Sequence, residues 1–469
     1  MPAEPAASRR AAAPPWDDVR AEAGAQVRLA APLAATQLGE IAIETTDVMM
    51  LGRLGPEALA AGTLGAHYAF FVLLFGFGVV TAVQPLVAQA KGARDVRGMR
   101  RYVRQGLWAA ALTALPVMAA FAAGAQILVA LGQAPDSADR AGGYLVAALG
   151  MVPGALAFMA LRGFVAALDR PGLALWVMLG GVAANAGLNG LLIFGALGFP
   201  RLELVGAGLA SSFVNLGMAG ALALLIARHR RLRRYHVFAR LWRPDRARLR
   251  RLFAVGVPMA LTLICEAGIF TASTIMMGWL GPEPLAAHGI ALQIAAVIFM
   301  IPLGIGLSAT VRVGQAHGAH DAAAVRRAGV VAYGLGIAVM AVATVILLAI
   351  PDTLIALFLP VQRPGNAEVV AIARDLLVLA AVFQLADGAQ VIGINALRGL
   401  TDTRVPLAFA LLGYWGGGIG TGWLLGIRLG YGGEGVWAGL AVGLGVVAML
   451  LAARFARLSH PSSKLMTSL

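Results

Sequence analysis

Cysteine is almost absent from this 469-residue chain, and charged residues are scarce. Cys265 is the only cysteine, which excludes an intramolecular disulfide and a thiolate cluster for zinc or an iron–sulfur centre. Charged residues make up 13% of the chain and hydrophobic residues 59%, a balance far from that of a water-soluble globular protein. The motifs HExxH, GxSxG and GxxxxGK(S/T) are missing, so we expect neither a membrane-embedded enzyme nor an ATP-driven pump.

Apolar residues gather instead in long blocks separated by short polar clusters. A helix of about 20 residues, rising 1.5 Å per residue, crosses the ~30 Å hydrocarbon core of a bilayer. The period-two alternation of a spanning β-barrel strand does not occur, which excludes a barrel. The chain is therefore expected to be an all-α membrane protein with twelve spanning helices, at about residues 28–51, 58–86, 105–131, 142–167, 173–197, 204–227, 252–280, 285–311, 328–359, 375–397, 405–427 and 435–456.

The N-terminal stretch to about Trp16 is rich in Ala and Pro and has no apolar run before Val27. We therefore expect no cleaved secretory signal. We also expect this tail to be disordered, because it has too few apolar residues to form a packed core.

The formal net charge of +14 raises the possibility of nucleic-acid binding, but the positions of the cations decide against it. Of the 37 Lys and Arg residues, 31 fall on the side of the membrane shared by both termini. Cytoplasmic loops carry such an excess, so both termini are expected in the cytoplasm. The densest cluster runs from Arg228 to Arg251, with eleven Arg opposed only by Asp245, and is expected to contact anionic lipid.

The chain contains an internal repeat at a constant offset of 226 residues. The stretch 32–95 matches 258–321 without a gap, with 23 identities in 64 positions. The clearest segments are LGPEALAAG against LGPEPLAAH, at Leu54 and Leu280, and VAQAKGARD against VGQAHGAHD, at Val87 and Val313. A third match, Leu161-Arg162-Gly163 against Leu397-Arg398-Gly399, is expected to follow the fourth helix of each half.

Each repeat has six predicted helices. Because this number is even, the chain returns to its starting side of the membrane after the first half, and both halves enter the membrane from that side. The two bundles should therefore be related by a pseudo-two-fold axis along the membrane normal, with a central cleft between them. The expected divisions are an N-terminal tail (1–27), an N-lobe (28–227), the basic linker (228–251), a C-lobe (252–456) and a C-terminal tail (457–469).

Three carboxylates lie within the first predicted span, where an ionisable side chain costs at least ~2.5 kcal/mol. Glu40, Glu44 and Asp47 are spaced by four and three residues, which places them on one helical face. Stacked acids repel one another in a low dielectric, so at least one is expected to hold a proton near neutral pH. This arrangement is typical of proton or cation exchange.

The C-terminal half carries two membrane acids of its own. The repeat aligns Glu266 with Glu40, and Asp387 lies in the tenth predicted span. The fifth span has Asn185 and Asn189, whose amide oxygens could ligate a hard cation such as Na⁺ beside Asp47. The alternative for each of these residues is a structural role, in which buried acids and amides hydrogen-bond neighbouring helices.

Four segments together resemble the MATE family of multidrug and toxic compound extrusion proteins, most closely its bacterial NorM-like branch. They are TTDVMMLGRLGPEALAAG, the stretch from Leu303 to Gly318, the NxxxN of Asn185 and Asn189, and FQLADGAQVIGINALRG. The resemblance spans residues 28–456 and implies a V-shaped pair of six-helix lobes that exports cationic amphipathic compounds by antiport with H⁺ or Na⁺. It also implies a place in the bacterial inner membrane and no cofactor beyond the coupling ion. We expect the protein to be a monomer.

The resemblance also assigns roles to single residues. Asp47, Asn185 and Asn189 match the family's coupling-ion residues, to which Glu40 and Glu44 add acids that the family pattern lacks. Glu266 and Asp387 match the acids of helices seven and ten, and are expected to bind the cationic substrate with Phe383. This Phe replaces a Tyr of Na⁺-coupled relatives, which together with Glu40 and Glu44 favours H⁺ while leaving Na⁺ open.

One rival function is a flippase for a lipid-linked precursor, which shares a duplicated helical architecture. Flippases commonly place basic residues in the cavity to bind pyrophosphate. The predicted spans contain acids and almost no central Arg or Lys, which disfavours this alternative.

Overall fold

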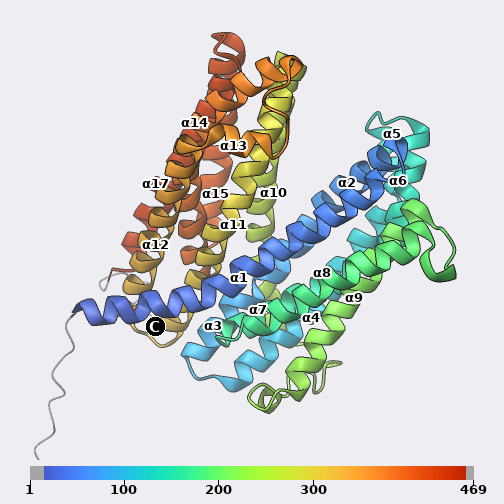
Figure 1. Cartoon of the computed structure of the whole chain (residues 1–469). Coiled ribbons are helices and arrows are strands. Elements are labelled where there is room, and N and C mark those ends of the chain that lie inside the picture. Colours follow the sequence, from blue (N-terminus) through green and yellow to red (C-terminus); the bar gives the residue numbers. More distant parts are fainter. Residues whose placement is uncertain (1–14, 461–469) are drawn as a thin grey trace, which may run out of the picture.

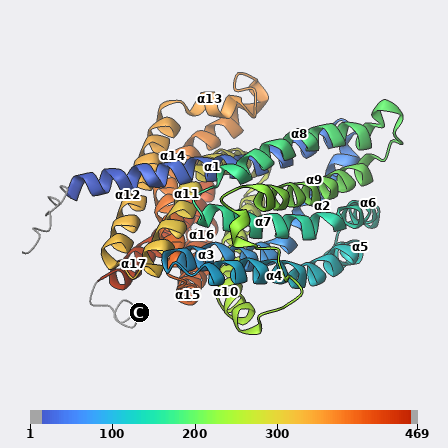
Figure 2. The same ribbon diagram turned by 90° about the horizontal axis from the view of Figure 1, so that it is seen from below.

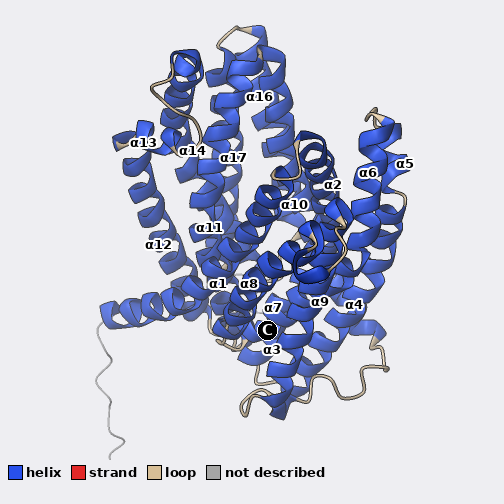
Figure 3. Ribbon diagram, turned by 45° about the vertical axis from the view of Figure 1, so that its right-hand side comes forward, coloured by secondary structure: helices blue, strands red, loops and turns tan. Residues whose placement is uncertain are grey.

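The computed structural model describes residues 15–460, which are helical almost throughout and contain no strand (Figure 3). Helix α1 begins at Pro15, so residues 15–27 of the predicted tail belong to the first helix. The expected disorder of the N-terminal tail otherwise concerns residues 1–14, which lie outside the described residues, as do residues 461–469.

The helices form two lobes joined by the basic linker (Figure 1). The N-lobe contains α1 (Pro15–Gly52), α2 (Pro56–Thr81), α3 (Val83–Gly92), α4 (Val96–Ala122), α5 (Gly124–Ala130), α6 (Pro135–Ala147), α7 (Met151–Ala167), α8 (Gly172–Phe194) and α9 (Glu203–Arg228). The C-lobe contains α10 (Arg246–Leu280), α11 (Pro282–Gly318), α12 (Ala322–Ala349), α13 (Pro351–Ala356), α14 (Ala367–Gly399), α15 (Arg404–Ala410), the π-helical segments η5 (Leu411–Ile419) and η6 (Leu424–Arg428) with α16 (Gly420–Trp423) between them, and α17 (Gly432–Leu458).

Within the described part of the chain, ten helical segments are long and apolar enough to cross a membrane. Two other segments occupy the remaining predicted spans. Helix α1 is 38 residues long but carries several charged residues. The stretch 404–428 is divided between α- and π-helix. The predicted all-α, two-lobed architecture is confirmed.

The sequence repeat reappears as matched backbone features in the two lobes. Gly55 and Gly281, 226 residues apart, precede α2 and α11 with φ angles of 119° and 128°, which only glycine adopts without strain. Asp95 and Asp321 cap α4 and α12, each accepting a hydrogen bond from the backbone N–H three residues later, at 2.8 and 2.9 Å. Equivalent residues therefore make equivalent contacts in both lobes.

The lobes also pack against each other through repeat-related residues. A Cβ on Gly78 of α2 would lie 2.2 Å from Cα of Ala260 on α10, and a Cβ on Gly304 of α11 would lie 2.6 Å from Cβ of Ala34 on α1. The two pairs are equivalent in the sequence repeat, in which Gly78 aligns with Gly304 and Ala34 aligns with Ala260. Small residues allow this close helix crossing, so α1 and α2 of the N-lobe interlock with α11 and α10 of the C-lobe.

Further contacts close the side of the molecule on which the C-terminal helix ends. There a Cβ on Gly92 would lie 1.9 Å from the carbonyl oxygen of Gln315, and a Cβ on Gly318 would lie 1.9 Å from that of Gln89. The Gln89 side chain donates to the carbonyl of Gly399 across the lobes at 2.9 Å. From this contact the lobes diverge toward the ends that hold α5 and α13 (Figure 1).

The first part of α1 reaches across to the C-lobe, where it runs beside α12 (Figure 2). Glu22 accepts two hydrogen bonds from Arg312 of α11, at 2.9 and 2.5 Å. The Gln26 amide donates to the carbonyl of Ala328 at 2.6 Å. Helix α1 therefore links both lobes before it continues along α8 of the N-lobe (Figure 2).

One sequence prediction about the helix ends was wrong. Arg162 lies within α7 and Arg398 within α14, not after the helices that they were expected to follow. The apolar residues around each arginine extend the helix past it, and both side chains are buried. The helices thus contain basic residues as well as acids.

Candidate functional site

In the N-lobe, α1 and α8 bring Asp47 together with Asn185 and Asn189. The Asp47 carboxylate accepts hydrogen bonds from both amide groups, at 3.0 and 2.5 Å. Asn189 also donates to Oδ1 of Asn185 at 3.3 Å. The spacing of four residues puts both Asn side chains on one face of α8, and both are fully buried.

The other two acids of α1 lie in different surroundings. Glu40 forms an ion pair with Arg162 of α7, with Oε1 and Nη1 2.6 Å apart. The same guanidinium donates to Oε1 of Gln37 at 2.6 Å. Glu44, between Glu40 and Asp47, is exposed and has no hydrogen-bond or ion-pair partner among the described residues. The three acids predicted to share one face of the first helix therefore differ in their contacts: Asp47 is hydrogen-bonded to amides, Glu40 is paired with an arginine, and Glu44 has neither kind of partner among the described residues.

In the C-lobe, Asp387 of α14 is almost fully buried, with 4% of its surface exposed. Its Oδ1 has no hydrogen-bond partner within the described residues. Glu266 of α10 is half-buried and interacts electrostatically with Asp387 and with Arg398. Tyr414 of the π-helical segment η5 lies beside the same group of charges. The C-lobe thus repeats the N-lobe's combination of a glutamate with an arginine.

Phe383 lies one turn before Asp387 in a cluster of aromatic rings. Its ring makes edge-on contacts with Phe270 at 6.1 Å and with Trp437 at 5.5 Å between ring centroids. Trp437 donates a hydrogen bond to Nδ1 of His288 at 3.1 Å. With 1% of its surface exposed, Phe383 packs against α10 and α17, and a direct contact with substrate stays a prediction.

These groups are suited to binding a proton or a monovalent cation. An ionised Asp47 accepts from the amide N–H groups, as it does here. If the two amides turned over, their oxygens would face Asp47 and accept from its protonated form or ligate Na⁺. Oδ1 of Asn189 is buried and has no partner among the described residues, so it is available for such a contact. No cluster of three or more His, Cys, Asp or Glu that could hold a metal ion occurs in residues 15–460.

Sequence reasoning missed Arg162, Arg398 and Tyr414 as neighbours of the acids. The Leu-Arg-Gly motif shared by the two halves contains both arginines, and the repeat had already aligned Glu40 with Glu266. A search for one arginine per lobe to pair with each glutamate would have connected them. Tyr414 carried no such signal, because only the folding of η5 against α10 and α17 brings it to the site.

Comparison with known protein families and proteins gives consistent results. The MatE family model matches residues 32–191 and 258–424. The chain is 44% identical over 440 residues to a probable multidrug resistance protein NorM from Mesorhizobium japonicum, covering 93% of this chain and 94% of that protein. It is 47% identical over 436 residues to a protein of the same description from Bradyrhizobium diazoefficiens, covering 92% and 93%.

Solved structures share the fold at low sequence identity. A mutant of the Vibrio cholerae MATE transporter VcmN aligns with a TM-score of 0.87 and 16% identity, covering 96% of this chain and all of that one. A multidrug resistance MATE family transporter in an outward-facing conformation aligns with a TM-score of 0.84 and 18% identity, covering 93% and 96%.

Proposed function

Because this chain belongs to the MATE family, we propose that it is a secondary active transporter that exports cationic amphipathic compounds in exchange for H⁺ or Na⁺. The curated relatives are described as probable multidrug resistance proteins. The observation that carries the proposal is the carboxylate of Asp47, held inside the N-lobe by two amide side chains. A membrane acid held in this way is typical of a coupling-ion site.

In this proposal Asp47, Asn185 and Asn189 bind the coupling ion. The exposed Glu44 would exchange cations with water, and Glu40 would take part through its pair with Arg162. Binding of a proton or Na⁺ neutralises Asp47, which removes the charge that the two amide N–H groups stabilise. The geometry around α1 and α8 then changes, because the hydrogen-bond donors lose their ionised acceptor.

Glu266 and Asp387 are the proposed substrate site in the C-lobe. The half-buried Glu266 offers an accessible negative charge, and Asp387 has a carboxylate oxygen without a partner in the described part of the chain. A cationic substrate would satisfy both electrostatically. The aromatic cluster around Phe383 supports the helices that hold these acids.

Transport requires the lobes to alternate between two arrangements. In the arrangement seen here they meet on the side that carries the C-terminus and diverge on the other (Figure 1). We propose that the closed side is cytoplasmic and that the membrane is the bacterial inner membrane. Ion binding would then bias the rocking of the lobes, by differential affinity for the two states.

The coupling ion is proposed to be H⁺, with Na⁺ as the alternative. Phe383 lacks a hydroxyl that could ligate Na⁺, and Glu40 and Glu44 add carboxylates that can carry protons. The linker with its eleven Arg is proposed to face anionic lipid. The transporter is proposed to act as a monomer, since each lobe supplies its own acids.

Export of a lipid-linked precursor is less well supported. It would need basic groups free to bind pyrophosphate, and the helices do contain Arg162 and Arg398. Arg162, however, is already paired with Glu40, and Arg398 lies near Glu266. Their charge is offset within the protein.

Proteoliposomes that contain the purified protein test this function. Uptake of ethidium would be followed with a pH gradient and a Na⁺ gradient imposed separately, and liposomes without protein serve as the control. The proposal expects uptake driven by the pH gradient, and uptake driven only by Na⁺ would identify the alternative ion. Absence of uptake under both gradients by folded protein would contradict it.

A further inference from the structure

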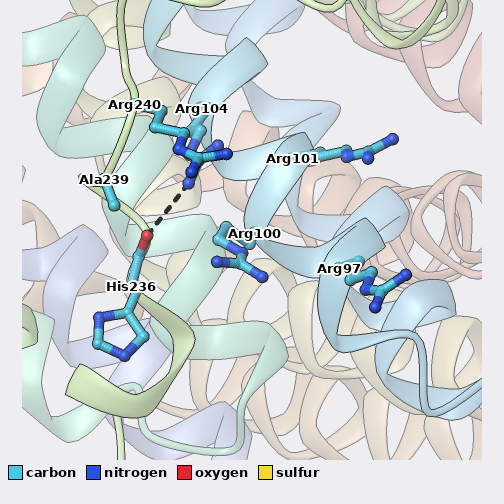
Figure 4. A pocket seen from close by; sticks show the side chains of 7 residues that line it. All are labelled: Arg97, Arg100, Arg101, Arg104, His236, Ala239 and Arg240. Carbon is cyan, nitrogen blue, oxygen red and sulfur yellow. Dashed lines mark hydrogen bonds between the residues drawn. The ribbon is translucent and has the colours of Figure 1, made fainter.

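A cavity of about 460 Å³ lies where the start of α4 meets the linker between the lobes (Figure 4). This arginine cradle is distant in sequence from the membrane acids, and the proposed transport cycle does not use it. Its lining residues come from α4 and from the linker, and are Arg97, Arg100, Arg101, Arg104, His236, Ala239 and Arg240.

The wall that the linker contributes is fixed in place. Arg104 donates hydrogen bonds to the carbonyls of Val237 and His236, at 3.2 and 3.4 Å, and Trp108 donates to the carbonyl of Leu241 at 2.7 Å. The side chain of Val237 is itself buried. The linker is therefore folded onto the N-lobe, and the cradle exists before any ligand binds.

The positive charge of the cradle is not balanced. No ion pair to Arg97, Arg100 or Arg240 occurs in the described part of the chain. Two carboxylates lie at its edges: Asp245 pairs with Arg248 at 2.7 Å and reaches Arg101 only at 3.7 Å, and Asp95 accepts a hydrogen bond from the backbone N–H of Gly98 at the start of α4. Like charges held together repel, so these arginines favour an anion with more than one negative charge.

The same face of α4 continues into an apolar track. From Arg97, steps of three or four residues lead through Arg101 and Arg104 to Trp108, Leu112 and Leu115, and these spacings keep one helical face. Trp side chains prefer the membrane–water interface. Leu112 and Leu115 are 42% and 66% exposed, as side chains that contact acyl chains would be.

We propose that the arginine cradle binds the phosphate groups of an anionic phospholipid, with the acyl chains along Leu112 and Leu115. Guanidinium groups bind phosphate oxygens through paired, charge-assisted hydrogen bonds. The proposal rests on the linker facing the lipid surface and adds a defined site to that general attraction. A free polyphosphate shares the headgroup chemistry but lacks the chains.

Binding of fluorescent cardiolipin, which has two phosphates, to the detergent-solubilised full chain tests the proposal. The cradle variant combines Arg97→Gln, Arg100→Gln and Arg240→Gln, which leaves Arg104 and its hydrogen bonds to the linker intact. The matched control combines Arg230→Gln, Arg231→Gln and Arg233→Gln, linker arginines that do not line the cavity. Thermal unfolding in neutral detergent checks that both variants fold.

The cradle variant is expected to bind cardiolipin at least about tenfold more weakly, the effect of losing one to two charge-assisted contacts, and the control about as well as the unmodified chain. Replacing Leu112 and Leu115 with Ser should weaken cardiolipin binding but not that of pyrophosphate. An equal loss in the cradle and control variants would overturn the site, leaving only diffuse attraction to the linker. Pyrophosphate binding as tight as cardiolipin binding would overturn the phospholipid assignment.

Discussion

Glu40 and Arg162 form an ion pair between α1 and α7, with Oε1 and Nη1 2.6 Å apart. Only 9% of the Arg162 side chain is exposed, against 37% of that of Glu40. The arginine is thus the partner that depends on the contact, because a buried guanidinium without an oppositely charged partner is costly. Glu44, one turn along α1, has no comparable partner among the described residues.

Replacing Glu40 should therefore destabilise the protein, and replacing Glu44 should not. We expect Glu40→Gln to cost about 1–3 kcal/mol, the usual penalty for leaving a buried polar group poorly paired. Glu44→Gln should change stability by less than about 0.5 kcal/mol, as exposed substitutions do. The thermal unfolding midpoints of the two variants, measured side by side in one detergent, check this. Equal midpoints would show that the ion pair adds nothing to stability.

Asp387 should affect substrate affinity without affecting folding. Its buried Oδ1 has no hydrogen-bond partner within residues 15–460, so Asp387→Asn removes a charge but no hydrogen bond to that atom. We expect a cationic dye to bind about tenfold more weakly, which corresponds to ~1.4 kcal/mol of lost charge attraction. Fluorescence titration of the purified variant measures this, and Asp375→Asn, also on α14, is the control with the same change of residue type. Unchanged dye affinity would remove Asp387 from the substrate site.

The contact between Glu22 and Arg312 should persist across the neutral pH range. Glu22 lies in the part of α1 that precedes the predicted span. Burial raises the pKa of its carboxyl, but the hydrogen bonds and the charge of Arg312 outweigh this, so that the pKa lies below its ordinary value of 4.5. Because the pKa is lowered, the pair contributes its full stabilisation at pH values above the ordinary pKa of 4.5. This stabilisation is lost only as the pH falls through the lowered pKa.

Glu22→Gln should therefore weaken the lobe contact at neutral pH, whereas mild acidification of the unmodified chain should not. Distances between spin labels on α1 and α12 measure the contact. Asp18→Asn, which removes an exposed pair with Arg327, is the control, because solvent-exposed pairs contribute little. Separation of the labels between neutral pH and about pH 6 in the unmodified chain would contradict the assignment.

Small residues at the lobe crossing should control the closed side. Gly92→Ala places a Cβ against the carbonyl oxygen of Gln315, and Gly318→Ala places one against that of Gln89. Neither backbone can yield without separating α3 from α11, so both variants should open this side. Gly445→Ala, with nothing within 4 Å of the added Cβ, is the control.

Alkylation of a cysteine at the buried Ser308, in a chain with Cys265→Ser, reports that opening. We expect labelling by a water-soluble maleimide to be several-fold faster in both glycine variants than in the control. Equal rates in all three would show that the close approach of α3 and α11 does not keep this side closed.

Much of the architecture could be predicted from the sequence because it depends on local or repeated signals. Long apolar blocks predicted the membrane-spanning helices. Sequence identities between the two halves at a constant offset predicted the two lobes. Asp95 and Asp321, matched in the repeat, are matched as helix caps in the structure. Helical spacing placed the acids on one face of the first span and the amides on one face of the fifth, and the resemblance to the MATE family associated Asp47 with Asn185 and Asn189. The structure brings these three residues together.

The structural features that were not predicted depend on contacts between distant residues, which sequence patterns do not encode. The pairing of Glu40 with Arg162 joins residues 122 positions apart, and helical periodicity does not fix how α7 is rotated toward α1. The first turns of α1 escaped prediction because Asp17, Asp18 and Glu22 lower the hydropathy of a segment that packs on the C-lobe. The arginine cradle likewise exists only after the linker folds onto α4.

The central claim is that neutralising Asp47 couples ion movement to export, and one measurement tests it most directly. Proteoliposomes with Asp47→Asn would be compared with the unmodified chain for ethidium uptake under the driving gradient, and for ethidium binding without a gradient. The account predicts that the variant loses gradient-driven uptake but keeps dye binding, because Glu266 and Asp387 remain. Gradient-driven uptake by the variant at the unmodified rate and with the same pH dependence would contradict it.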